Sequence, residues 1–224
     1  MHSRNYVKKQ GYCLICFKDL NDDVSFSFLF SFNKVICNKC INKFKFINKI
    51  EFVNGIETTF LYEYDTFFKT LLYQYKGCYD IALKDVFLYK YKDVINKKYK
   101  GYTIIYPPSY ALENNKRGFI HIKEIVSILK LKNKEIFIKI ENHKQSSYSY
   151  KNRSQISKYI KLKNSNLLTD KKYLIVDDVY TSGQTLKTII NILIKNKVKK
   201  ENIKALILSK TPDSVELWRT IFIY

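Results

Sequence analysis

Arginine is the scarce cation of this chain of 224 residues, which has four arginines against 36 lysines. The chain also lacks internal repeats and low-complexity runs, so nothing in it indicates a repeat protein. No apolar run approaches the length of a bilayer span, and no basic and then apolar secretory segment opens the sequence. We therefore expect a soluble, cytoplasmic protein that does not insert into a membrane.

The net charge of +20 is the sum of 40 lysines and arginines and 20 acidic residues. Together with 18 asparagines and many isoleucines, the lysine excess is typical of a protein from an AT-rich genome, which weakens the charge as evidence for a partner. A positive surface still attracts polyanions through counterion release, and 19 tyrosines and 15 phenylalanines offer stacking partners for bases. Single-stranded DNA therefore stays open as a partner.

Two arginines stand in segments that are predicted to be loops or helix entrances, Arg117 and Arg153. Where lysine is the default cation, a retained arginine indicates a need for its planar, bidentate fork, which suits a phosphate group. Both are candidate phosphate ligands, and a surface ion pair is the alternative for each.

Two adjacent carboxylates follow a strand of the buried type. Residues 173–176 read Tyr-Leu-Ile-Val, which has the length and apolar character of a strand that helices cover on both faces. Asp177 and Asp178 come next, at the edge where open α/β sheets collect their ligands. Ionised aspartate only accepts hydrogen bonds, so the pair suits the hydroxyl groups of a sugar ring.

A hydroxyl-rich turn follows the two carboxylates and leads into a helix. Apolar residues from Leu186 to Leu193 recur every three or four positions and mark one helical face. A helix N-terminus has unpaired N–H groups and a partial positive charge, so it binds a phosphate without any lysine. The residues expected to hold that phosphate are Thr181, Ser182, Gly183, Gln184 and Thr185.

The order of strand, acidic pair, glycine and two threonines resembles the 5-phosphoribosyl-1-diphosphate (PRPP) motif of type I phosphoribosyltransferases. The resemblance implies that Asp177 and Asp178 contact the ribose hydroxyls and that residues 181–185 hold the 5′-phosphate. Magnesium is expected with the ligand. An ordinary strand-to-helix turn is the alternative, and a Walker loop fits less well because no Gly-Lys-Ser/Thr sequence occurs here.

Four cysteines in the first forty residues form two C-x2-C pairs with 20 residues between them. Each pair presents two thiolates from one turn, and two such turns complete a tetrahedral site for structural zinc. Two disulfides are the alternative. The predicted zinc ligands are Cys13, Cys16, Cys37 and Cys40, while Cys78 is expected to be a part-buried thiol.

The rest of the chain alternates between the two periodicities. Helices are predicted over residues 67–75, 81–99 and 122–129. Strands are predicted over residues 101–106, 134–140, 173–176 and 203–209, the first of them as the first strand of the sheet. Residues 107–118 are predicted to be a loop, and the polar residues 141–172 a long loop that is either functional or disordered. This alternation predicts an α/β fold with a parallel sheet flanked by helices.

The cysteine pairs and the PRPP-type motif together resemble the ComF family, named from bacterial competence for DNA uptake. Further family elements are seen here as Tyr75-Lys76-Gly77 and as Arg117-Gly118-Phe119-Ile120-His121, where the family has Asn-Gln in place of Ile120-His121. The resemblance implies a zinc-binding module at residues 1–50, a type I phosphoribosyltransferase-like domain at residues 51–224, and competence proteins as partners.

Two main function classes remain, and a nucleotide-sensing regulator is a third, weaker option. The first is an enzyme that transfers a phosphoribosyl group, in which Asp177 and Asp178 are the catalytic carboxylates, residues 107–109 and Arg117 face the pyrophosphate, and residues near Arg153 close over the site. The second is a non-catalytic adaptor or single-stranded-DNA-binding protein that keeps the fold. His121 and His143 are the candidate general bases, each with an ordinary surface role as the alternative.

Overall fold

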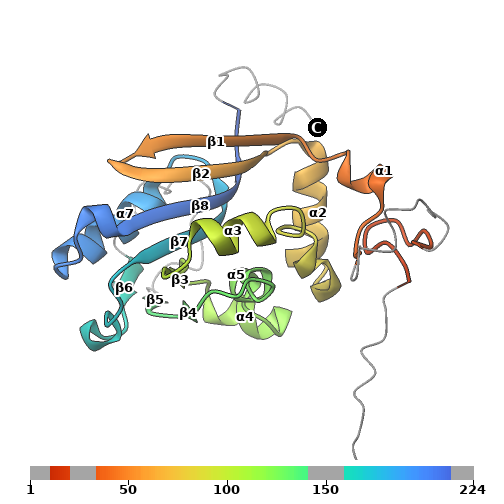
Figure 1. Ribbon diagram of the computed structural model, residues 1–224. Helices are drawn as coiled ribbons and strands as arrows, with labels where there is room; N and C mark the ends of the chain where they lie inside the picture. Colours follow the sequence, from red (N-terminus) through yellow and green to blue (C-terminus); the bar gives the residue numbers. More distant parts are fainter. Residues whose placement is uncertain (1–10, 21–33, 141–158, 213–224) are drawn as a thin grey trace, which may run out of the picture.

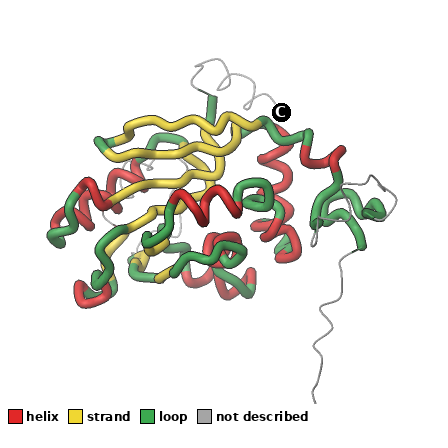
Figure 2. Tube along the Cα trace, viewed as in Figure 1, coloured by secondary structure: helices red, strands yellow, loops and turns green. Residues whose placement is uncertain are grey.

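The computed structural model of the chain describes residues 11–20, 34–140 and 159–212 (Figure 1). At its centre is a six-stranded sheet in the order β1-β2-β8-β7-β3-β4, which Figure 2 shows as the yellow layer between the helices. The first two strands pair antiparallel, and every other neighbouring pair in this sheet is parallel. The predicted α/β fold with a mainly parallel sheet is therefore confirmed.

The strands of this sheet are β1 (Phe46–Val53), β2 (Ile56–Glu63), β3 (Thr103–Ile105), β4 (Asn133–Lys134), β7 (Tyr173–Tyr180) and β8 (Ile203–Lys210). A second sheet consists of the antiparallel strands β5 (Phe137–Lys139) and β6 (Ile160–Leu162). The α-helices are α1 (Asn38–Ile41), α2 (Thr66–Lys76), α3 (Lys92–Lys98), α4 (Ala111–Arg117), α5 (His121–Val126) and α7 (Gln184–Lys195). Short 3₁₀ turns lie at η2 (Ile81–Asp85), η4 (Ser165–Leu167) and η5 (Lys200–Asn202).

An Asn-Gly turn joins β1 to β2. Asn54 and Gly55 are the two residues between the strands, and both have positive φ, 51° and 75°. A two-residue hairpin loop of type I′ requires positive φ at both central positions, and asparagine and glycine are the residues that accept it most easily. The hairpin therefore follows from a local signal, although the sequence around it has no clear helical or strand periodicity.

The two faces of the sheet pack against different helices. Leu174 and Val176 of β7 belong to one buried cluster, whereas Tyr173 and Ile175 belong to the other. The first cluster includes apolar residues of α2 and α5, and the second includes the apolar face of α7. That face consists of Leu186, Ile189, Ile190 and Leu193, as the three- and four-residue spacing predicts. Each of these side chains contributes roughly 1.5–3 kcal/mol by leaving water.

Several predicted elements differ from those in the structure. The helix predicted over residues 81–99 is divided by turns into η2 and α3, and the strand predicted over residues 134–140 is divided into β4 and β5. The strand at residues 101–106 is β3, third in chain order rather than first, because the hairpin precedes it. Part of the predicted loop, residues 111–117, forms α4. The helix predicted over residues 67–75 is confirmed as α2, and the helix predicted over residues 122–129 is present as α5, which ends three residues earlier, at Val126.

The cysteine segment, residues 11–20 and 34–44, packs against the end of the sheet layer beside α2 (Figure 1). Phe44 is buried, and its ring meets that of Phe67 at a centroid distance of 5.1 Å with the planes perpendicular. Cys13, Cys37 and Cys40 belong to the same buried cluster as Phe68 of α2. β1 spans residue 50, so the sheet begins within the segment predicted as the cysteine module.

Candidate functional site

The acidic pair lies inside β7, whereas the sequence pattern predicts that it follows the end of the strand. β7 pairs with β8 as far as Tyr180 and Lys210, whereas its pairing with β3 stops at Ile175. The predicted end of the strand is therefore wrong, because backbone hydrogen bonds on the β8 side continue through both aspartates. On the β3 side, Asp177 and Asp178 lie beyond the last paired residue and border an open edge.

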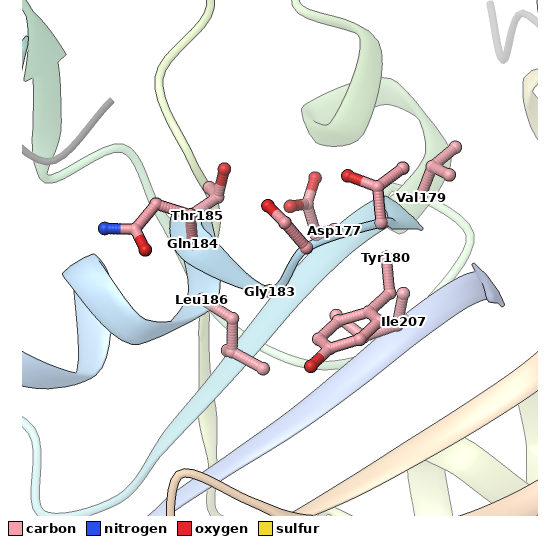
Figure 3. A pocket seen from close by; sticks show the side chains of 10 residues that line it. Asp177, Val179, Tyr180, Gly183, Gln184, Thr185, Leu186 and Ile207 are labelled. Atoms are coloured by element: carbon pink, nitrogen blue, oxygen red, sulfur yellow. The ribbon is translucent and has the colours of Figure 1, made fainter. Parts of the chain in front are cut away.

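The turn after β7 leaves the N-terminus of α7 without a side-chain cap. Gly183 is the N-cap residue, with φ of 68°, in the left-handed region that glycine accepts at no steric cost. Glycine has no side chain to bind the first N–H groups of the helix, so they remain available to a ligand. A cavity of about 120 Å³ lies at this end of the helix, and Figure 3 shows the residues that line it. They are Asp177, Val179, Tyr180, Thr181, Ser182, Gly183, Gln184, Thr185, Leu186 and Ile207.

Tyr180 lies against Gly183 on one side of the turn. A Cβ atom at position 183 would be only 2.5 Å from the Tyr180 hydroxyl oxygen, so the glycine also makes room for this side chain. The Tyr180 ring meets Phe60 edge-on at a centroid distance of 5.3 Å, which holds it over β8. Figure 3 shows Asp177 and Thr185 on the other side of the turn from the Tyr180 ring. A ligand therefore has to approach the helix from the side of Asp177.

The two carboxylates face opposite sides of the sheet. Asp177 lines the cavity at the start of α7, on the face that α7 covers. Asp178 is 8% exposed and contacts residues of α2 and α5, on the other face. Alternation of side chains along a strand produces this separation. The cavity at the turn is therefore lined by Asp177 and not by Asp178.

Asp178 is held by two side chains from distant parts of the sequence. The Lys76 Nζ atom lies 2.6 Å from Asp178 Oδ2, and the His121 Nε2 atom lies 3.3 Å from the same oxygen. The other carboxylate oxygen, Oδ1, accepts the backbone N–H of Val179 at 2.8 Å. Lys76 is the last residue of α2, where the helix dipole also favours a cation.

These contacts set the charges of the pair in opposite directions. Burial acts to raise the pKa of Asp178, but Lys76 and His121 outweigh it and hold that pKa below its ordinary value. Burial and the neighbouring charge of Asp178 raise the pKa of Asp177. Burial acts to lower the pKa of Lys76, but Asp178 outweighs it and raises that pKa. Lys76 and Asp178 therefore form a charged pair, and Asp177 is the carboxylate that protonates more easily.

Arg117 and Ser109 join this cluster through His121. The Arg117 Nη1 atom lies 3.3 Å from His121 Nδ1, and the Ser109 hydroxyl lies 3.1 Å from the same nitrogen. Arg117 also donates from Nε to the Lys76 carbonyl oxygen at 3.1 Å. The structure thus brings Arg117 and the loop at residues 107–109 together near Asp178.

Arg153 and His143 fall outside the described residues, so nothing places them relative to the site. Lys76 was missed as a site residue by sequence reasoning, although the element Tyr75-Lys76-Gly77 was visible. Its position in that element was the signal that could have found it.

Comparison with known proteins gives one family match. Residues 115–223 match the model of the phosphoribosyl transferase domain. This segment includes β7, the turn and α7, so the chain is similar to the phosphoribosyl transferase domain over the part that contains the PRPP-type motif. No curated protein sequence matched the chain.

Solved structures with some similarity include two crystal forms of a hypoxanthine phosphoribosyltransferase from Staphylococcus aureus. The orthorhombic form has a TM-score of 0.37 and 14% sequence identity, and the tetragonal form has a TM-score of 0.33 and 18% identity. Each comparison covers 58% of this chain and 74% of the other.

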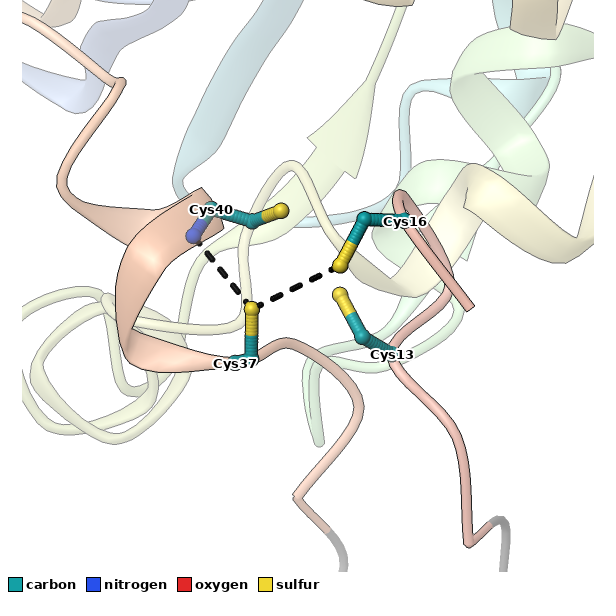
Figure 4. Close-up of side chains that lie close together, drawn as sticks. All are labelled: Cys13, Cys16, Cys37 and Cys40. Carbon is teal, nitrogen blue, oxygen red and sulfur yellow. Dashed lines mark hydrogen bonds between the residues drawn. The ribbon is translucent and has the colours of Figure 1, made fainter. Parts of the chain in front are cut away.

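The four N-terminal cysteines form a second candidate site (Figure 4). Their Sγ atoms all lie within 4.8 Å of one another, and those of Cys16 and Cys37 are 3.7 Å apart. Tetrahedral zinc with Zn–S bonds of about 2.3 Å places its sulfur ligands roughly 3.8 Å apart. All four are free thiols, so the structure does not have the alternative disulfides. Cys78 is exposed, and the prediction that it is part-buried is wrong because it follows α2 in a surface turn.

Backbone contacts bring the two C-x2-C pairs together. Leu14 donates its N–H to the Val35 carbonyl oxygen at 2.9 Å, which joins the two segments, and within the second pair Cys40 donates its N–H to Cys37 Sγ at 3.4 Å. Burial and the neighbouring cysteine sulfurs raise the pKa of Cys40 far above its ordinary value. Four adjacent thiols cannot all ionise without a compensating charge, and a divalent cation supplies it. The cluster therefore fits a metal ion, and this ligand set is one that zinc favours.

Among the residues that the structure describes, no helix is both long enough and apolar enough to cross a membrane.

Proposed function

We propose that the chain binds PRPP, or a related ribose 5-phosphate ligand, and transfers its phosphoribosyl group to a nitrogen nucleophile. The observation that carries this proposal is the uncapped N-terminus of α7, which opens on a cavity lined by Asp177 and by the hydroxyl groups of Thr181, Ser182 and Thr185. The match of residues 115–223 to the phosphoribosyl transferase domain supports it.

The 5′-phosphate would bind at the turn. The N–H groups at the start of α7 and the three hydroxyl groups are donors that converge on one small cavity. The left-handed backbone at Gly183 aims successive N–H groups toward the same point, as in other anion-binding turns. Asp177 would then accept hydrogen bonds from the ribose hydroxyls, because it is the carboxylate on the cavity side.

Lys76 and Arg117 would face the pyrophosphate. Lys76 stays charged because Asp178 raises its pKa, and the described contacts of Arg117 use only Nε and Nη1 of its guanidinium. Both therefore keep donors for an anion next to the open edge of β7. In the transfer, the bond from C1 to the pyrophosphate oxygen breaks, its electron pair leaves with pyrophosphate, and a nitrogen lone pair forms the new bond to C1. Positioning and electrostatics dominate such a reaction.

Magnesium would accompany the diphosphate. Asp177 lies in no ion pair among the described residues and stands beside hydroxyl groups, which matches the oxygen ligands that magnesium prefers. When bound, the ion would offset the charge of the pyrophosphate leaving group.

Calorimetry with PRPP and magnesium tests the proposal. We expect the unmodified protein to bind, and we expect Asp177→Asn to weaken binding at least about tenfold, since it replaces one of the two acceptor oxygens meant for the ribose hydroxyls with an N–H donor. Asp93→Asn is the matched control, because Asp93 is exposed on α3, outside the residues that line the cavity. The site assignment fails if the unmodified protein gives no binding heat, or if Asp177→Asn binds as tightly as the control.

We also propose that the cysteine cluster holds one structural zinc ion and that the protein works in the cytoplasm, where thiols stay reduced. Four cysteines leave no open coordination position, so this zinc would stabilise the fold and take no part in the transfer. Its role would be to fasten residues 11–20 and 34–44 to α2.

The resemblance to ComF supports a link to DNA uptake, with competence proteins as partners, and the +20 charge supports contact with single-stranded DNA. A titration of DNA affinity against salt tests this candidate role. Binding through several phosphates gives a steep decrease of log affinity with log salt, with a slope near −0.7 for each phosphate contacted. A flat dependence, or no binding near physiological salt, would count against the DNA role and leave the PRPP site unaffected.

A further inference from the structure

His121 lies between an arginine and a carboxylate that would otherwise attract each other. Its Nδ1 atom faces Arg117 Nη1 at 3.3 Å, and its Nε2 atom faces Asp178 Oδ2 at 3.3 Å. The imidazole is buried, with 12% of the side chain exposed. Its backbone is also fixed, because the Tyr75 hydroxyl donates to the His121 carbonyl oxygen at 2.7 Å.

The neighbours of the ring determine which nitrogen carries the proton. Guanidinium groups only donate hydrogen bonds, so the contact with Arg117 requires an unprotonated Nδ1 that accepts. The proton is then on Nε2, which donates to Asp178. Ser109 can donate to the same Nδ1 without conflict. A doubly protonated ring would direct an N–H group at the Arg117 N–H and would lose that contact, while the Ser109 hydroxyl could accept instead of donate.

The ring also acts as a spacer. Arginine and carboxylate form bidentate pairs when nothing separates them, and such a pair would remove both charges from the site. With the imidazole between them, Asp178 pairs with Lys76, and Arg117 keeps part of its guanidinium for another anion. We propose that neutral His121, protonated on Nε2, is a positioning residue that keeps Arg117 and Asp178 apart. Its effect on ligand binding rests on the function proposed above.

Glutamine and asparagine provide a matched pair of variants. A glutamine amide has one group that accepts and one that donates, so His121→Gln can accept from Arg117 and donate to Asp178 as the neutral ring does. His121→Asn has the same chemistry on a side chain that is one carbon shorter, which cannot span both contacts. The pair therefore separates the spacer role from the mere presence of a polar group.

Nitrogen NMR of the imidazole tests the tautomer without any ligand. At neutral pH we expect His121 to show a protonated Nε2 and an unprotonated Nδ1. The imidazole signals of His121 are assigned as those that are missing from the spectrum of His121→Gln. The opposite tautomer, or an imidazolium at pH 7, would overturn the inference.

Calorimetry with PRPP and magnesium tests the spacer. We expect the affinity of His121→Gln for PRPP to lie within about threefold of that of the unmodified protein, and His121→Asn to bind at least about tenfold more weakly. A cooperative thermal unfolding transition checks that both variants are folded. Equal affinities of the two variants would overturn the spacer role. If the unmodified protein itself does not bind PRPP, the proposed function fails, while the NMR result still decides the tautomer.

Discussion

Lys76 and Asp178 stand 102 residues apart in the sequence and form an ion pair with an N–O distance of 2.6 Å. The pair connects the end of α2 to the open edge of β7, and it is shielded from water, with 31% of the lysine and 11% of the aspartate side chain exposed. Since α2 also packs against the cysteine segment, this contact joins the two candidate sites through one helix.

Removal of the lysine charge is expected to destabilise the protein. Lys76→Met leaves the Asp178 carboxylate buried with His121 as its remaining side-chain partner, and we expect the free energy of unfolding to fall by about 2 to 3 kcal/mol. Urea unfolding measures the change. Lys45→Met is the control, because Lys45 is 59% exposed in its pair with Glu63, and we expect about 0.5 kcal/mol or less. Equal losses in the two variants would contradict the importance of burial at Lys76.

Burial of His121 predicts a dependence of stability on pH. Burial lowers the pKa of His121, and Lys76 and Arg117 act in the same direction, while Asp178 acts against them and is outweighed. The folded protein then binds fewer protons at this site than the unfolded chain, whose histidine titrates near 6.5. Stability from this group is therefore present above about pH 6.5 and is lost as the pH falls below it.

His121→Gln isolates this contribution. The other titrating groups, including Asp177 and Asp178, are common to the unmodified protein and to His121→Gln. The difference in the free energy of unfolding between these two proteins is therefore measured at pH 7.5 and at pH 5.5. We expect this difference to shift against the unmodified protein as the pH falls, by at most about 1.4 kcal/mol per pH unit for one proton. A difference that stays constant across this range would show that His121 does not change its pKa on folding.

Gly183 is expected to tolerate no side chain. Gly183→Ala places a Cβ 2.5 Å from the Tyr180 hydroxyl oxygen and forces alanine to adopt φ of 68°. We expect a loss of about 2 to 4 kcal/mol in urea unfolding, together with loss of PRPP binding. Gly101→Ala is the control, since Gly101 has φ of 84° but nothing within 4 Å of an added Cβ, and the backbone term alone costs about 1 kcal/mol. If both variants lose the same stability, the contact with Tyr180 has no energetic weight.

The sequence predicts the parts of the molecule that local patterns determine. Residue spacing within one short segment predicts the apolar face of α7, the turn before this helix and the cysteine cluster. The structure contains each of these features. The β1–β2 hairpin belongs to the same class, because Asn54-Gly55 is a strong hairpin signal that lies within one short segment.

The contacts of Asp178 could not be predicted in this way. They depend on how α2 and α5 pack on the sheet, and no periodicity within one segment encodes which lysine or histidine comes within reach. The opposite orientation of Asp177 and Asp178 depends in turn on the continuation of β7, which the neighbouring strand β8 determines. The sequence does not mark this continuation clearly, because two adjacent aspartates, which are unfavourable in strands, come before Val179 and Tyr180.

Removal of zinc is expected to destabilise the cysteine segment. The described part of the cysteine segment buries few large apolar side chains of its own, Leu20, Ile36 and Phe44, so its order is expected to depend on the metal. We expect one zinc per chain in the purified protein by elemental analysis, and its removal by a strong chelator to lower the unfolding temperature. Cys37→Ser is expected to lose the zinc, because it removes one of four ligands, whereas Cys78→Ser removes an exposed thiol outside the cluster and keeps it. Zinc retained at full occupancy in Cys37→Ser would place the ion elsewhere. A chelator effect on stability with PRPP affinity unchanged would show that the zinc is structural and acts apart from the phosphoribosyl site.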